Sequence, residues 1–129
     1  MKRLAKRKKR YRTRHPCDKG WRVRWTAKFR RQAKSLGIWK SVRFELKDLE
    51  RKLSSPESMS KTLQSLLAKP VVLDVYVKSL RKWFPARRYY FGKKTARGFF
   101  VVQMDICRVW FVSIKPRTSK TYKKKSERI

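Results

Sequence analysis

The net charge of this chain limits what it can fold into more than any other feature of its sequence. Its 129 residues include 39 Lys and Arg but only 8 Asp and Glu, which gives a formal charge of +31. Placed on a sphere with a radius of about 18 Å, this charge repels itself by on the order of 100 kcal/mol in unscreened water, and by about a third of that at physiological salt. Since folded domains are stable by only about 5–15 kcal/mol, we expect the native state to lie against a polyanion whose phosphates supply the countercharge.

The basic residues are unevenly distributed along the chain. Sixteen of them lie within residues 1–34, where Asp18 is the only acid. Hydrophobic residues make up 40% of the chain and include five Trp, five Tyr and seven Phe, which is enough apolar material for a folded core. We therefore predict one domain over residues 21–116, between a basic N-terminal arm at 1–20 and a basic C-terminal tail at 117–129.

Cysteine usage and hydropathy give expectations about the environment. Cys17 and Cys107 are far apart in the sequence and no apolar signal segment is present, so we expect no disulfide framework and a reducing compartment. No apolar run reaches the roughly 20 residues that span a bilayer. Mitochondrial transit peptides are also basic, but residues 1–14 contain few apolar residues and no serine, so we interpret them as a nucleic-acid-binding arm.

The clearest helix that the sequence predicts covers residues 21–36. Its apolar residues recur at three- and four-residue spacing, which places them on one helical face: Trp21, Trp25, Phe29, Ala33 and Leu36. Basic residues cover the rest of the surface. Gly37 follows where a left-handed C-terminal cap is expected.

Two further helices are predicted before residue 70. Apolar residues from Trp39 to Leu53 repeat with the same helical spacing and predict a helix that ends near Ser54. A short strand is the alternative, because residues 42–46 also alternate between apolar and charged, but the length of the pattern favours a helix. Ser55-Pro56-Glu57 is typical of a helix start, and Pro70 ends that third helix.

The second half of the chain is rich in β-forming residues. Residues 71–77 fit a strand or a helix equally well, and this choice stays open. Strands are predicted at 88–91, 99–104 and 107–114, with a turn at 92–98 between the first two, and Pro116 closes the last. The sequence therefore predicts an α+β fold, with helices in the first half, an antiparallel β-hairpin or sheet in the second half, and extended basic tails at both ends.

Basic residues interleaved with aromatic ones favour binding to structured RNA, because Arg can both bind phosphate oxygens in pairs and stack on exposed bases. Tyr11 lies in the arm and is a candidate for stacking or wedging, whereas Trp21, Trp25 and Trp39 are better explained as core or interface residues. The turn at 92–98 is either a basic finger or an ordinary solvated turn. The candidate RNA-binding residues are Arg3, Lys6, Arg7, Lys8, Lys9, Arg10, Tyr11, Arg12, Arg14, Arg22, Arg24, Lys28, Arg30, Arg31, Lys34, Arg87, Arg88, Lys93, Lys94, Arg97, Arg117, Lys120, Lys123, Lys124 and Lys125.

The sequence contains no pattern that indicates a metal, a cofactor or a small-molecule substrate. His15 and Cys17 are close together, but the chain has no CxxC or HxxxH spacing and few acids to complete a ligand set. Asp74 and Asp105 do not pair with a histidine or another carboxylate at a catalytic spacing. We therefore expect no metal, no cofactor and no enzymatic activity.

The layout of the chain resembles that of ribosomal proteins: a small globular domain, Lys/Arg-rich extensions at both ends, and no catalytic constellation. This resemblance implies a structural protein of a large ribonucleoprotein that neutralises and positions ribosomal RNA. Its partners would be rRNA or another structured RNA and the neighbouring proteins of the assembly, without a membrane. The sequence leaves open whether the ribosome is cytoplasmic, mitochondrial or of another organelle.

Two alternative functions share this electrostatic character. Helices followed by a β-rich half are similar to the bacterial toxin endoribonucleases, which can use Arg, Lys and Tyr in place of histidine. In that case Arg88, Tyr89, Tyr90 and Arg108 are the candidate catalytic residues. A DNA-condensing or viral nucleoprotein is the third possibility, but it does not account for arginine-rich ends.

The arm interpretation can be tested by a combined substitution of Arg7, Arg10, Arg12 and Arg14 by Ala. We expect weaker RNA binding and a dependence of log K on log salt that is shallower by about 3, because each lost phosphate contact removes about 0.7–0.9 from the slope. RNA titrations at several salt concentrations measure this, with circular dichroism as the control for folding. An unchanged slope would contradict the arm model.

Overall fold

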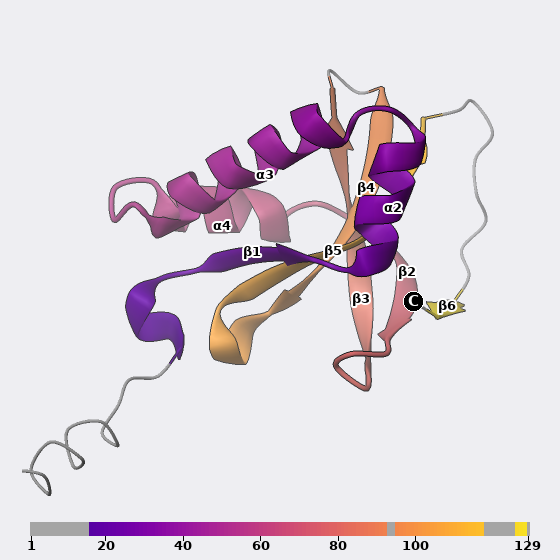
Figure 1. Ribbon diagram of the computed structural model, residues 1–129. Coiled ribbons are helices and arrows are strands. Elements are labelled where there is room, and N and C mark those ends of the chain that lie inside the picture. The colour runs from indigo at the N-terminus through magenta and orange to yellow at the C-terminus, as the bar shows by residue number, and fades with distance from the viewer. Residues whose placement is uncertain (1–15, 93–94, 118–125, 129) are drawn as a thin grey trace, which may run out of the picture.

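The computed structural model describes residues 16–92, 95–117 and 126–128, and it confirms the α+β class. Within these ranges, three α-helices lie in the first half of the chain, and most of a largely antiparallel sheet lies in the second half. No helix in the described ranges is long and apolar enough to cross a membrane. The elements are η1 Pro16–Lys19, β1 Arg22–Trp25, α2 Ala27–Ser35, α3 Trp39–Ser54, α4 Met59–Leu67, β2 Val71–Val77, β3 Lys82–Phe91, β4 Ala96–Gln103, η2 Met104–Ile106, β5 Arg108–Pro116 and β6 Ser126–Arg128 (Figure 1).

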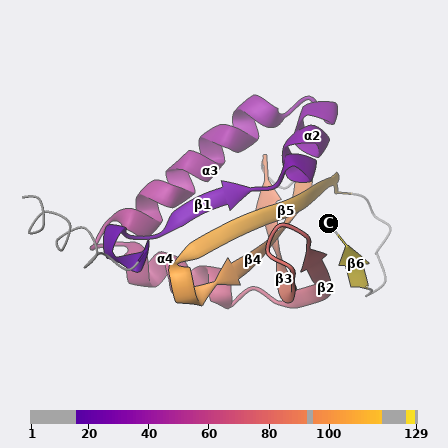
Figure 2. The same ribbon diagram turned by 60° about the horizontal axis from the view of Figure 1, so that its bottom comes forward.

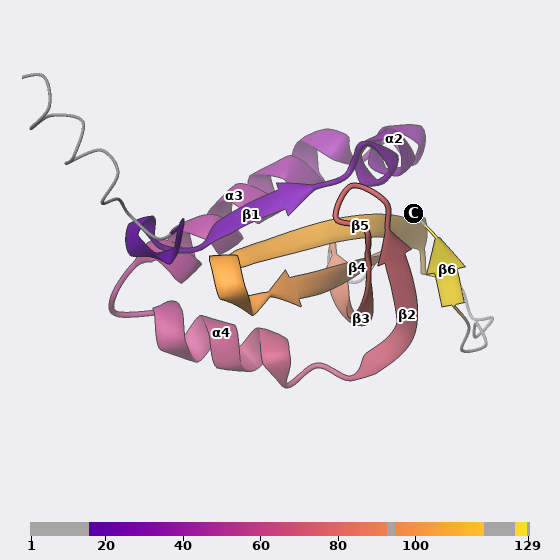
Figure 3. The same cartoon turned by 90° about the horizontal axis from the view of Figure 1, so that it is seen from below.

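The six strands form one sheet in the order β1-β5-β4-β3-β2-β6. The four central strands β5, β4, β3 and β2 are antiparallel to one another, whereas β1 runs parallel to β5 and β6 runs parallel to β2. The strand direction turns strongly across the sheet, so that β1 and β3 run in clearly different directions in Figure 1. Seen from below, β2 and β6 stand at one end of the curved sheet. Helices α2 and α3 lie beside β1, at the other edge (Figure 3).

The predicted helix over 21–36 is wrong in its first third, because residues 22–25 form strand β1. Within and just before this strand, Trp21 and Val23 are buried while Arg24 is exposed, which is the two-residue period of a strand. The helix begins only at Ala27, where the Thr26 hydroxyl accepts a hydrogen bond from the Phe29 backbone at 3.2 Å. Residues four positions apart lie on one face in a helix and in a strand alike. The spacing of Trp21, Trp25 and Phe29 therefore could not distinguish a helix from a strand.

The remaining helices agree more closely with prediction. Gly37, with φ +73°, ends α2 as expected, and the backbone N–H of Ile38 reaches back to the Ala33 carbonyl at 3.1 Å. Helix α3 spans Trp39–Ser54, which settles the choice between helix and strand. Helix α4 begins at Met59, later than predicted, because residues 55–58 form a turn, and it ends before Pro70.

The open segment at 71–77 is strand β2, and the strands after it are longer than predicted. Residues 82–91 form one strand, β3, rather than only 88–91. The predicted turn at 92–98 is also shorter, because β4 starts at Ala96 and includes Arg97 and Gly98. Lys93 and Lys94 lie outside the described residues. Arg97 is therefore a strand residue and not part of a finger.

Both faces of the sheet are buried, each by its own core. On the helix side, Phe29 from α2 and Leu46 and Leu53 from α3 pack on sheet residues that include Phe100 and Phe111. On the far side a smaller core contains Leu73, Val75, Val77, Phe84, Ala86, Phe99, Val101 and Val112. The central strands β4 and β5 are therefore apolar on both sides, which explains why they read as nearly continuous hydrophobic runs.

Carboxylates of α3 fasten the helical layer to the sheet. The Glu50 Oε2 atom accepts a hydrogen bond from the Val23 backbone at 2.9 Å, and the Glu45 Oε2 atom accepts one from the Gly92 backbone at 3.0 Å. The Arg24 guanidinium lies 3.8 Å from Glu50. Charge-assisted bonds of this kind stabilise a structure by about 1.5–3 kcal/mol each, so two of the few acids have a structural role.

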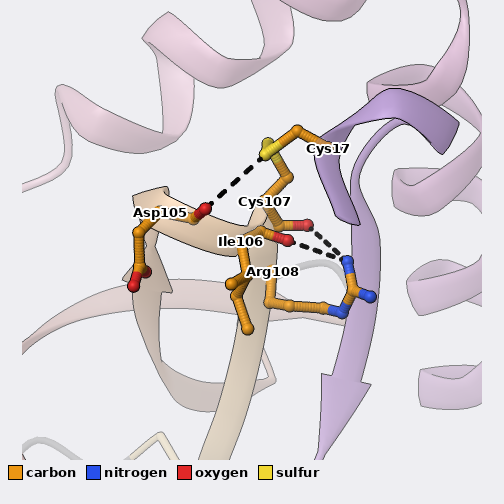
Figure 4. Close-up of a disulfide and its surroundings, with 5 residues drawn as sticks. All are labelled: Cys17, Asp105, Ile106, Cys107 and Arg108. Carbon is orange, nitrogen blue, oxygen red and sulfur yellow. Dashed lines mark hydrogen bonds between the residues drawn. A yellow bond between two sulfur atoms is a disulfide. The ribbon is translucent and has the colours of Figure 1, made fainter. Parts of the chain in front are cut away.

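A disulfide joins Cys17 in η1 to Cys107 at the start of β5, which contradicts the sequence-based expectation (Figure 4). The two residues are 90 positions apart, but the parallel pairing of β1 with β5 brings them together, and the backbone of Arg22 donates to the Cys107 carbonyl at 3.1 Å. A long separation in the sequence does not argue against a disulfide here, because the parallel pairing of β1 with β5 brings the two cysteines together.

This disulfide predicts a measurable loss of stability on reduction. Because it closes a loop of about 90 residues in the unfolded chain, its removal in Cys17→Ser should lower the free energy of unfolding by about 2–4 kcal/mol. Thermal melting with and without dithiothreitol measures the effect, and Cys17→Ser serves as the control that should not respond to the reductant. Identical melting of the wild type under both conditions would show that the bond contributes nothing.

Candidate nucleic-acid interface

Many of the predicted RNA-binding residues lie outside the described part of the structure. These are Arg3, Lys6, Arg7, Lys8, Lys9, Arg10, Tyr11, Arg12, Arg14, Lys93, Lys94, Lys120, Lys123, Lys124 and Lys125. Their assignment stays a prediction from the sequence. The other ten predicted residues lie in the described ranges.

Five residues at one end of the far sheet face form what we call the arginine–tyrosine cluster. Tyr90 on β3 is paired with Arg97 on β4, and Arg97 is paired with Lys115 on β5. Residues that are paired in this way share a sheet face, and so does Arg88, two positions before Tyr90. Arg117 follows directly after β5 and completes the cluster.

Tyr90 is the centre of this cluster. The guanidinium carbon of Arg117 lies 5.3 Å from the centroid of the Tyr90 ring, and that of Arg88 lies 5.6 Å from it. Both distances are in the range of cation–π contacts. The backbone of Arg117 donates to the Thr95 carbonyl at 3.1 Å, which fixes this residue beside the hairpin. The cluster therefore presents guanidinium groups that are held in place by an aromatic ring.

The local sequence gives this cluster a positive electrostatic potential. Strands β3, β4 and β5 contain no Asp or Glu, and Glu45 and Glu50 of α3 bind backbone groups elsewhere. Two like charges about 7 Å apart repel by about 2 kcal/mol at an effective dielectric constant of 20. A phosphate placed among the guanidinium groups would convert this repulsion into attraction.

A second basic region, the tryptophan groove, lies between the start of α2 and the turn from β2 to β3. Its volume is about 590 Å³. Trp25 and Trp110 supply aromatic walls, and Lys28, Arg31 and Lys78 supply positive charge. The Trp110 indole donates to the Gln103 side chain at 2.9 Å. Lys28 and Arg31 were predicted as RNA-binding residues, and the structure brings them together with two tryptophans.

Other predicted residues lie apart from these two regions. Arg30 and Lys34 are exposed on α2, and Arg22 and Arg24 lie on the β1 edge. Arg87 is directed toward α4, where its guanidinium donates to the carbonyls of Leu67 and Lys69 at 3.1 and 2.6 Å. It thus connects β3 to the end of the helix and is not available in the cluster. Trp21 is in the core, as the sequence suggested.

Sequence reasoning missed a third basic surface, which we call the lysine groove. It lies between α3, α4 and β3, has a volume of about 620 Å³ and is lined by Leu49, Lys52, Lys61, Thr62, Ser65, Leu66, Lys69, Tyr89 and Tyr90. Burial, followed by the negative charges of Glu45 and Asp48, raises the pKa of Tyr89. No short sequence motif could have indicated this surface, because its lysines come from separate elements.

Of the four candidate catalytic residues of a nuclease, the structure brings only Arg88 and Tyr90 together. Arg88 and Tyr90 share the arginine–tyrosine cluster, whereas Tyr89 is directed to the helix side, with its ring 4.9 Å from that of Phe91. Arg108 lies at the other end of β5 and donates to the carbonyls of Ile106 and Cys107 at 2.9 and 3.1 Å (Figure 4). Burial and the neighbouring Arg24 and Arg22 lower its pKa.

No three His, Cys, Asp or Glu side chains within the described ranges are grouped so that they could hold a metal ion. Comparisons of the chain with models of protein families, with curated proteins and with solved structures found no match. The three basic surfaces are therefore the features of the molecule that point to a function.

Proposed function

We propose that this protein binds structured RNA as a component of a large ribonucleoprotein, with the arginine–tyrosine cluster holding the phosphate backbone. The observation that carries the proposal is the position of Arg88 and Arg117 over the Tyr90 ring, with Arg97 and then Lys115 in the same row of paired residues on acid-free strands. Guanidinium groups bind phosphate oxygens in pairs, and a tyrosine ring can stack on an unpaired base. The net charge of +31 supplies a long-range attraction to the same ligand.

The arginine–tyrosine cluster and the tryptophan groove lie near opposite ends of β5. The buried far-side core, which includes Phe99, Val101 and Val112, lies between them. The two regions are therefore separate contact points for a polyanion and not one open face. The ribosome is the assembly that the basic extensions favour, with rRNA as the ligand and adjacent ribosomal proteins as further partners.

Removal of two guanidinium groups tests the RNA site. We expect Arg88→Ala with Arg117→Ala to weaken binding of a structured RNA by about a hundredfold or more, since each of the two lost charged hydrogen bonds contributes about 1.5–3 kcal/mol. The salt slope should also become shallower by about 1.4–1.8. The matched control is Arg43→Ala with Lys47→Ala, which removes two exposed charges from α3. Equal losses in both double variants would reject the cluster as a specific site.

Assembly into a large particle is tested by sedimentation of the native protein from gently lysed source cells. We expect it to migrate with a ribosomal subunit at moderate salt and to leave that fraction after ribonuclease treatment, because phosphates would provide most of the attraction. Immunodetection across the gradient measures this. A protein that stays at the top of the gradient with and without ribonuclease would contradict the assembly.

A second candidate function, RNA cleavage, is favoured by the place of Tyr90 among the guanidinium groups. In this reaction the ribose 2′-oxygen loses its proton and attacks the adjacent phosphorus. The bond to the 5′-oxygen then breaks, and that oxygen takes up a proton, which leaves a 2′,3′-cyclic phosphate and a 5′-hydroxyl. Tyr90 is placed to transfer a proton, and Arg88 and Arg117 to stabilise the charge on the phosphorane.

The same binding mixtures separate the two candidates. For a structural protein, labelled RNA stays intact over long incubation with the wild type. For a nuclease, products with a cyclic phosphate appear, and Tyr90→Phe abolishes them while it leaves RNA binding within about twofold, because only the hydroxyl is lost.

A further inference from the structure

The lysine groove and the arginine–tyrosine cluster share Tyr90, which lines the first and forms the centre of the second. We propose that the lysine groove binds a single-stranded segment of the RNA whose backbone is held at the cluster. This inference rests on the proposed function and adds a second, separate site to it. The occupant is unpaired RNA, recognised by its phosphates and its bases.

The side chains of the groove match both parts of a nucleotide. Lys52, Lys61 and Lys69 supply three ammonium groups, and the Lys69 Nζ atom lies 5.6 Å from the centroid of the Tyr89 ring. The Lys52 Nζ atom is 3.3 Å from an Asp48 carboxylate oxygen, so Lys61 and Lys69 are the lysines that we expect to contact phosphates. The hydroxyl groups of Thr62 and Ser65 can bond to sugar or base oxygens.

Tyr89, whose side chain lies on the helix side of the sheet, provides the aromatic contact of the groove. Tyr89 is packed beside Phe91, Phe100 and Phe111, with ring centroids 4.9–6.2 Å away, which holds its ring in position. The Tyr89 hydroxyl, protonated at neutral pH like that of any tyrosine, can donate a hydrogen bond. Base stacking on an aromatic ring contributes about 1–3 kcal/mol per base.

The lysine groove lies beside the part of β3 that extends beyond its pairing with β2. Strand β2 pairs with β3 only as far as Arg87, and beyond this point no strand among the described residues pairs with that edge of β3. Tyr89 and Tyr90 lie in that part of β3, directly beside the groove. A volume of about 620 Å³ falls within the range of about 300–1,000 Å³ of small-ligand sites. This is room for nucleotides of a single strand and far too little for a double helix.

The experiment compares two RNA ligands that differ in one feature: a blunt-ended hairpin, and the same hairpin with a short single-stranded extension. We expect the wild type to bind the extended RNA more tightly. Lys61→Ala with Lys69→Ala should remove this advantage and reduce the salt slope for the extended RNA by about 1.4, because two single-strand phosphate contacts are lost. Binding of the blunt hairpin should stay unchanged. The matched control is Lys40→Ala with Lys47→Ala, two exposed lysines of α3.

The outcomes separate this inference from the proposed function. If Lys61→Ala with Lys69→Ala behaves like its control on both ligands, while Arg88→Ala with Arg117→Ala still weakens binding, the groove is not an RNA site and the function stands. If the wild type binds neither RNA, both proposals fail together. Near-ultraviolet circular dichroism of each variant verifies folding, and cross-linking from a 4-thiouridine in the extension to Tyr89 or Tyr90 gives a second readout that does not depend on affinity.

Discussion

The parallel pairing of β1 with β5 is the contact on which the rest of this structure depends. It attaches the N-terminal segment to a strand that is buried on both faces, and it positions α2, whose capping Thr26 donates through its backbone to Phe111 and through its hydroxyl to Val112. The same pairing brings Cys17 to Cys107. Figure 2 shows β1 running along β5 beneath α3, so that one pairing connects the helical layer, the sheet and the N-terminal end of the domain.

The few acidic residues and the many basic ones have different places in this fold. Glu45 and Glu50 are directed from α3 to backbone groups of the sheet, where a charge-assisted bond stabilises the packing of two layers. Asp48 forms ion pairs with Arg51 and Lys52 on the helix surface, and these side-chain contacts lower its pKa. The strands that carry the arginine–tyrosine cluster have no acid at all. A strong positive potential at this end of the sheet follows from that separation.

Three basic surfaces combine cations with aromatic rings, and this combination is the physical basis of the proposed RNA binding. The ring of Tyr90 and the indoles of Trp25 and Trp110 offer flat faces to bases, while Arg and Lys beside them offer countercharge to phosphates. A purely electrostatic tether would not need aromatic residues at these positions. The proposed structural role and the alternative of RNA cleavage use the same cluster and differ in what the Tyr90 hydroxyl does.

The sequence by itself determined the net charge, the α+β class, the helix over 39–54 and the cap at Gly37, because these depend on composition and on contacts a few residues apart. It also named Arg88, Arg97 and Arg117 as candidates. Only the tertiary structure decided that residues 22–25 are a strand, since a four-residue spacing fits helix and strand alike until a partner strand is present. Strand register placed Tyr90 beside Arg97 and Arg97 beside Lys115, and the parallel pairing of β1 with β5 brought Cys17 to Cys107. Both are contacts between distant residues, which no local pattern encodes.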